Sequence, residues 1–185
     1  IQSTSNRLAG ISSSWLVPFT LSRILWFMVS HSQSQNYEGQ AQKNHAQMLD
    51  VFAGLLPRLD EGRALKLVLL GDGPLRGKLQ DQCRQLSLKI FDNERDRIFD
   101  DDVQVYFLGF QSNPYRLLSK AQLMLLTSYW EGLPIALLEA MALGVPSVVS
   151  DCSEGIREVW NLTGKSAHSA TLNQAITTPF GILAP

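Results

Sequence analysis

Histidine and cysteine are scarce in this sequence, with three histidines and two cysteines in 185 residues. Cys83 and Cys152 have no CxxC spacing, and His31, His45 and His168 form no ligand cluster with them. A structural zinc site needs four closely placed nitrogen and sulfur ligands. Asp100, Asp101 and Asp102 are consecutive in a charged stretch, which indicates solvated rather than metal-chelating carboxylates. We therefore expect reduced thiols, no metal site and no cofactor.

An excess of charge of either sign is also lacking. Sixteen basic residues against seventeen acidic residues leave a formal net charge of −1. A balanced chain gives no bulk electrostatic reason to bind nucleic acid. Nucleic acid is therefore not an expected partner, and any phosphate binding must be local.

Uninterrupted hydrophobic runs of membrane-spanning length are absent. The longest apolar stretch, residues 15–29, is broken by Pro18, Thr20 and Arg23, whereas a membrane-spanning helix needs roughly 20 apolar residues. No secretory leader is visible, and the chain begins with Ile, as a fragment would. We expect a cytoplasmic protein.

The composition is that of a folded chain, with 45% hydrophobic and 18% charged residues. Such a chain can bury a core, so a single compact domain is the simplest expectation. The serine-rich start predicts a linker over residues 1–22, followed by a domain over residues 23–185.

Short aliphatic runs alternate with helical patterns along this domain. We predict strands at 24–29, 65–73 (closing glycine turn included), 103–110, 122–128, 146–150 and 181–183. We predict helices at 44–59, from Pro74 onward, and at 114–120, 134–143 and 154–160. The charged stretch 89–102 is expected to be an exposed insertion.

Continuous aliphatic strands alternating with helices indicate a parallel sheet buried on both faces. The predicted fold class is therefore α/β, a Rossmann-like parallel sheet with flanking helices. Ligands of such sheets bind at the carboxyl ends of the strands, where the loops 71–74, 109–113 and 128–134 would meet.

The segment EGLPIALLE carries two carboxylates, Glu131 and Glu139, separated by seven residues. Pro134 suits the first turn of a helix, which places Glu131 in the preceding loop and Glu139 inside the helix. A helix N-terminus offers unpaired N–H groups to a phosphate, while carboxylates accept hydrogen bonds from sugar hydroxyls. Gly132 would let the backbone approach a ligand closely.

With these residues in view, the chain resembles the C-terminal domain of GT-B retaining glycosyltransferases of the family 4 type. The shared landmarks, in order, are QKNH (42–45), LLGDGPL (69–75), FLGF (107–110), EGLPIALLEAMALGVP (131–146), DCSEGIREV (151–159) and PFGILAP (179–185). The resemblance covers about residues 42–185. It implies the C-terminal half of a GT-B fold and a nucleoside-diphosphate sugar as donor, a UDP- or GDP-sugar, for retaining transfer of a hexosyl group.

The resemblance also implies the site. Lys43 would pair with the diphosphate and Glu131 would contact the donor sugar, and these two are the catalytic candidates. Glu139 would hold the ribose. The remaining donor-binding candidates are backbone or base contacts: Gly132, Leu133, Pro134, Gly71, Gly73, Phe110 and Gln111.

Structural explanations exist for several of these residues. EGLP alone would suit an ordinary helix start. Lys43 would also suit a solvated residue at the start of another helix. GDGP is a common turn, and Phe110 would also suit the core. We interpret His45 as a surface or capping residue and Cys152 as a small buried filler.

The sequence departs from the family pattern in two respects. A Gly-Arg-Leu turn usually precedes the QKNH landmark and gives an arginine to the diphosphate, but no arginine lies between Arg23 and Arg58. Nothing here supplies the N-terminal Rossmann-like domain that normally holds the acceptor. We expect this isolated chain to be inactive in transfer.

Other functions remain open at this point. A nucleotide-sugar 2-epimerase uses a similar fold but needs further acid and base residues. A non-catalytic nucleotide-sugar-binding module would explain the missing arginine. The acceptor is not indicated, and peripheral membrane association of the full-length enzyme stays open.

Overall fold

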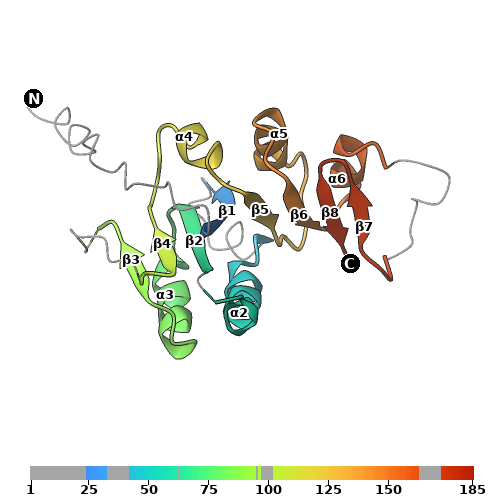
Figure 1. The fold of residues 1–185 in the computed structure, drawn as a ribbon. Coiled ribbons are helices and arrows are strands. Elements are labelled where there is room, and N and C mark those ends of the chain that lie inside the picture. The colour runs from blue at the N-terminus through green and yellow to red at the C-terminus, as the bar shows by residue number, and fades with distance from the viewer. Residues whose placement is uncertain (1–23, 33–41, 62, 95, 97–101, 163–171) are drawn as a thin grey trace, which may run out of the picture.

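The structure, a computed structural model, describes residues 24–32, 42–61, 63–94, 96, 102–162 and 172–185 (Figure 1). The predicted linker over residues 1–22 lies outside the described residues. The predicted α/β fold with a Rossmann-like parallel sheet is confirmed.

The described strands form an eight-stranded sheet in the order β3-β4-β2-β1-β5-β6-β8-β7. The bounds are β1 (Ile24–Ser32), β2 (Ala64–Gly71), β3 (Ile90–Asp92), β4 (Val105–Phe107), β5 (Leu123–Leu126), β6 (Ser147–Ser150), β7 (Ile176–Thr178) and β8 (Gly181–Ala184). Neighbouring strands pair in parallel except β7 and β8, which are antiparallel.

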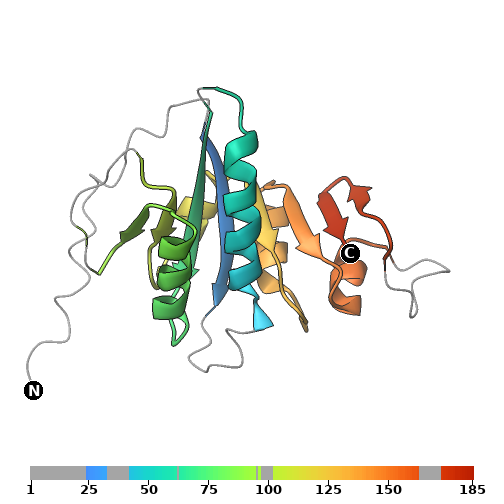
Figure 2. The same ribbon diagram turned by 90° about the horizontal axis from the view of Figure 1, so that it is seen from below.

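Helices cover both faces of the sheet. The bounds are α2 (His45–Leu55), α3 (Arg76–Gln85), α4 (Tyr115–Leu118), α5 (Ile135–Ala142) and α6 (Glu154–Val159), and a 3-10 turn, η2 (Leu56–Arg58), follows α2. Helices α2 and α3 lie on one face, and α4 and α5 on the other (Figures 1 and 2).

The aliphatic part of β2, residues 67–70, is buried on both faces of the sheet. Leu67 and Leu69 pack into the core under α2 and α3, whereas Val68 and Leu70 pack into the core under α5 and α6. Alternate residues of one strand therefore fill two separate cores, as expected for a strand buried on both faces.

At the edges of the sheet one sequence prediction is wrong and one strand was missed. Residues 90–92, predicted to be part of an exposed insertion, form β3, and Phe91 and Asp92 are buried. The antiparallel strand β7 was not predicted.

Some predicted elements are shorter in the structure. The helix predicted over 44–59 ends at Leu55 and becomes a 3-10 turn where Pro57 interrupts it, and the strand predicted over 103–110 is regular only over Val105–Phe107.

Candidate functional site

The strand order reverses direction between β1 and β5. From β1 the chain proceeds to β2 and β4 on one side, and it returns to place β5 on the other side of β1. Such a topological switch point leaves a crevice at the carboxyl ends of the two strands. Lys43 follows β1 and Glu131 follows β5, so the switch point lies between the two candidate catalytic residues.

Lys43 and Glu131 form an ion pair at this crevice. The Lys43 Nζ lies 2.7 Å from Glu131 Oε1 and 3.0 Å from Oε2, and the Ser128 hydroxyl donates to Oε1 at 2.6 Å. The Glu131 side chain is 5% exposed and that of Lys43 is 18% exposed. The carboxylate is thus fixed in place, while the ammonium still reaches the surface.

The loop after β5 holds the segment that carries Lys43. The Thr127 hydroxyl contacts the carbonyls of Lys43 and Asn44 at 3.1 and 3.2 Å, and the Tyr129 N–H donates to the Gln42 carbonyl at 2.8 Å. Asn44 is buried and adopts the left-handed conformation (φ 51°), a region that asparagine tolerates better than most residues. This turn directs Lys43 toward Glu131 just before α2 begins.

The loop from Gly132 to Pro134 leads from this ion pair into α5. Leu133 is exposed, and a Cβ built on Gly132 would meet open space. On the other side, a Cβ on Gly155 would lie 2.4 Å from the Gly132 carbonyl oxygen. Helix α6 therefore packs against the back of this loop and leaves its front open to a ligand.

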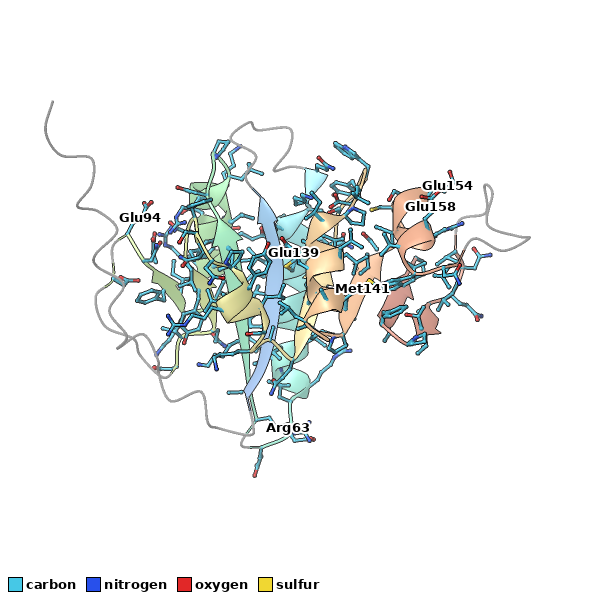
Figure 3. The ribbon with its side chains drawn as sticks, turned by 90° about the horizontal axis from the view of Figure 1, so that it is seen from above. Arg63, Glu94, Glu139, Met141, Glu154 and Glu158 are labelled. Atoms are coloured by element: carbon cyan, nitrogen blue, oxygen red, sulfur yellow. The ribbon has the colours of Figure 1, made fainter. Side chains whose placement is uncertain are left out.

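Glu139 lies in the second turn of α5 and has a partner that the sequence did not suggest. The Tyr115 hydroxyl, from α4, donates to Glu139 Oε1 at 2.9 Å. This hydrogen bond, followed by the charge of Glu139, raises the pKa of Tyr115. Figure 3 shows Glu139 on the side of the sheet that α4 and α5 cover.

The glycine turn after β2 borders a small pocket. Gly71 and Gly73 adopt positive φ angles (103° and 154°), which only glycine adopts readily. Asp72, Arg76 and Phe107 also line this pocket, with Leu69, Leu70 and Leu79. The pocket opens at the carboxyl end of β2, where the sequence placed a nucleotide.

His45, the first residue of α2, is half-buried and lines the same pocket, which the sequence interpretation of a surface or capping residue did not foresee. Burial, and after it the charge of Lys43, lowers the pKa of His45 to about 4. The imidazole is therefore neutral at physiological pH. The sequence shows no more than a histidine at a helix start, so it does not reveal the position of His45 in the pocket.

The other predicted base-contacting residues lie in the loop after β4. Phe110 is 62% exposed, which excludes the alternative that it belongs to the core. Gln111 folds back, and its side-chain amide donates to the Leu108 carbonyl at 2.6 Å. The Gly71 N–H donates to the Gly109 carbonyl at 2.8 Å, so this loop and the glycine turn are joined.

The described residues hold neither a cluster of metal ligands nor a membrane-spanning helix. Among them, no group of three or more His, Cys, Asp or Glu side chains could hold a metal ion. None of the helices in the described part of the chain is long and apolar enough to cross a membrane.

Residues 38–169 match the family described as "Glycosyl transferases group 1". The chain is similar to an uncharacterized glycosyltransferase of Methanocaldococcus jannaschii, with 37% identity over 94 residues, which is 51% of this chain and 20% of that protein. It is also similar to the lipopolysaccharide 1,6-galactosyltransferase of Salmonella typhimurium, with 32% identity over 127 residues, 66% of this chain and 30% of that protein.

Among solved structures, the chain is similar to Anabaena Alr3699/HepE in complex with UDP. The TM-score is 0.56 at 20% identity, and the match covers 80% of this chain and 35% of that chain. At this identity the likeness shows a shared fold. The matches to the two curated relatives span less than a third of either protein's length.

Proposed function

This chain belongs to the glycosyl transferases group 1 family, and we propose from this premise that it is the donor-binding half of a retaining glycosyltransferase that uses a nucleoside-diphosphate sugar. The observation that carries the proposal is the Lys43–Glu131 ion pair at the switch point between β1 and β5. It sets a cation for the diphosphate beside a carboxylate for the sugar, at the edge where such sheets bind ligands.

The similar proteins support a nucleotide-sugar donor. HepE was solved with UDP, and the Salmonella relative is named as a galactosyltransferase. A UDP-hexose is therefore the donor class we propose for this chain, with hexosyl transfer as the reaction.

Lys43 would stabilise the departing diphosphate. Its ammonium has three donors, and Glu131 occupies it through two close oxygen contacts. A bound diphosphate would share or take over these contacts, and the released Glu131 carboxylate would accept a hydrogen bond from a donor-sugar hydroxyl. Ser128 keeps Glu131 in position during this exchange, since its hydroxyl contacts the same carboxylate.

The remaining candidates would hold the nucleotide. A Cβ on Gly132 would meet open space and Leu133 is exposed, so a ligand can approach this loop at the start of α5, where the two backbone amides would suit a phosphate. The ribose hydroxyls would bind Glu139, whose Oε1 already accepts from Tyr115. The base would lie between the Gly71–Gly73 turn and the loop that carries Phe110 and Gln111.

The arginine missing from the QKNH region leaves Lys43 as the cation that we assign to the diphosphate. Arg76 lines the neighbouring pocket, but its guanidinium binds Asp92 at 2.6 Å. Losing one charge-assisted contact in a water-poor site costs roughly 2 to 4 kcal/mol of transition-state stabilisation. We therefore propose slower transfer than in a site with both cations.

The acceptor would be held by a second Rossmann-like domain of the same protein. The proposal is supported by the two curated relatives, since the matches to them cover only 20% and 30% of their lengths. Alignment of acceptor and donor can supply roughly 7 to 11 kcal/mol of barrier reduction, and one half of a cleft does not provide it.

Calorimetric titration of the chain with UDP, GDP and ADP tests the donor site. We expect UDP to bind most tightly of the three, and Lys43→Met to weaken that binding about tenfold to a hundredfold, as for a lost charged hydrogen bond. The Lys43→Met variant should also carry Glu131→Gln, so that no buried carboxylate is left unpaired.

The matched control is Lys120→Met, which removes an exposed lysine beyond α4 and should leave affinity unchanged.

Glu139→Gln should weaken nucleotide binding by about 1 to 3 kcal/mol. A folded wild-type chain that binds none of the three nucleotides would sink the proposal, as would a double variant with undiminished affinity.

A further inference from the structure

The segment around β3 is bound to the loop that follows β4. The Asn93 side-chain amide donates to the Leu108 carbonyl at 2.9 Å, and the Asn93 backbone N–H donates to the Phe107 carbonyl at 3.1 Å. A Cβ on Gly109 would lie 3.2 Å from Asn93 Nδ2, so the loop passes directly against this side chain. Asn93 thus fixes the path of residues 107–109.

Asn93 is in turn held by a buried ionic network. The Arg76 guanidinium donates to Asn93 Oδ1 at 2.8 Å and to Asp92 Oδ1 at 2.6 Å, and Gln80 donates to Asp92 Oδ2 at 2.6 Å. Asp92 is 3% exposed. Because both Asn93 and Asp92 are anchored by one guanidinium, the Asn93 side chain has little freedom to rotate.

The fixed loop is the one proposed to border the base. Arg76 also donates to the Phe107 carbonyl at 3.2 Å, and Gly71 donates to the Gly109 carbonyl at 2.8 Å. Three successive carbonyls, of residues 107 to 109, therefore accept hydrogen bonds from the protein, and the loop is tied to the glycine turn opposite.

We propose that Asn93 is a positioning residue that sets the selectivity of the site for its nucleoside base. This inference rests on the proposed nucleotide-sugar function. A base is discriminated only if the groups facing it are held to within about half an ångström, and side chains behind a site supply that rigidity. Asn93 does not touch the base; it holds the Leu108–Gln111 loop at the distance that suits one base.

The test measures the dissociation constants of UDP, GDP and ADP for wild type and Asn93→Ala by calorimetry. We expect wild type to prefer one base, and Asn93→Ala to weaken that nucleotide about fivefold to tenfold while the other two change less than about twofold. Asn93→Asp keeps the shape of the side chain but replaces its donor with an oxygen, so the same loss of preference is expected.

The matched control is Glu94→Ala, at the neighbouring exposed position, whose side chain lies at the outer edge of the sheet beyond β3 (Figure 3). It should leave all three constants unchanged. Three results overturn this inference alone. They are an unchanged base preference in both Asn93 variants, an equal loss of affinity for all three nucleotides, and a wild type that shows no base preference. A wild type that binds no nucleotide overturns the proposed function as well.

Discussion

Lys43 and Glu131 form one contact that joins the two proposed binding roles, for the diphosphate and for the donor sugar. The pair is nearly neutral as a unit, and its carboxylate is more buried than its ammonium. Removing one member of a buried ion pair leaves an uncompensated charge, which typically costs about 3 to 5 kcal/mol for a fully buried pair. Single substitutions here therefore disturb folding and binding together, whereas paired substitutions separate the two effects.

His45 gives the structure a predictable pH response. Its pKa is lowered to about 4, whereas an unfolded histidine has a pKa of about 6.5. Between these values the unfolded chain binds the extra proton, so the free energy of unfolding should fall as the pH falls from about 6.5 to about 4. His45→Gln should lose roughly 1 to 3 kcal/mol of that pH dependence.

The measurement is urea denaturation at pH 7 and pH 4.5 for both proteins. His31 and His168 are present in wild type and variant, so their contributions cancel. Identical pH dependence in the two proteins would show that the His45 imidazole is not kept neutral by the fold.

Sequence reasoning at this scale found residues inside dense motifs and missed their partners. Glu131, Glu139 and Lys43 were identifiable because each belongs to a recognisable landmark. Tyr115 and Asn93 were not, since their hydrogen-bond partners lie 24 and 15 residues away in the chain, and neither belongs to one of the landmarks.

Helices α5 and α6 together shape the loop that faces the ligand. The extended Ser153 precedes α6, and Gly155 in its first turn lets the helix approach the Gly132 carbonyl. The front of Gly132 remains open. Two glycines 23 residues apart therefore differ in what they allow: Gly155 permits close packing of α6, and Gly132 is proposed to permit ligand access.

Alanine at these two positions should separate folding from binding. In Gly155→Ala the new Cβ would overlap the Gly132 carbonyl, so we expect about 1 to 3 kcal/mol of destabilisation and weaker nucleotide binding. Gly132→Ala should change stability by no more than about 0.5 kcal/mol, because its Cβ meets no atom, yet still weaken binding.

Thermal denaturation and calorimetric titration check both variants. Full affinity in Gly132→Ala would mean that no ligand approaches this face of the loop. Wild-type stability in Gly155→Ala would contradict the close packing of α6.

The central strands and main helices could be predicted because their aliphatic runs and helical periods are long. The sheet edges could not. Strand β3 has three residues and is followed by charged ones, so its buried pair, Phe91 and Asp92, gives no recognisable pattern. Strand β7 is also three residues long, and it is mostly exposed, which leaves no alternation to detect.

At the scale of the whole molecule, the strand order decides where chemistry can occur. The fold class and the carboxyl-end location followed from the alternation of strands and helices, but the switch point between β1 and β5 required the observed order. That order brings together landmarks 88 residues apart, Lys43 and Glu131. Arg63 lies at the opposite end of the sheet from Glu94 and Glu154 (Figure 3).

The most direct test of a donor site at this edge is amide chemical-shift mapping of the chain by NMR during titration with UDP. We predict that the largest shifts occur at the amides of Gly71, Gly73, Gly109, Gly132 and Leu133, with the amides around Arg63 unchanged. Shifts confined to the Arg63 end of the sheet, or no shifts at millimolar UDP, GDP or ADP, would contradict the assignment of this domain as a nucleotide-sugar-binding half.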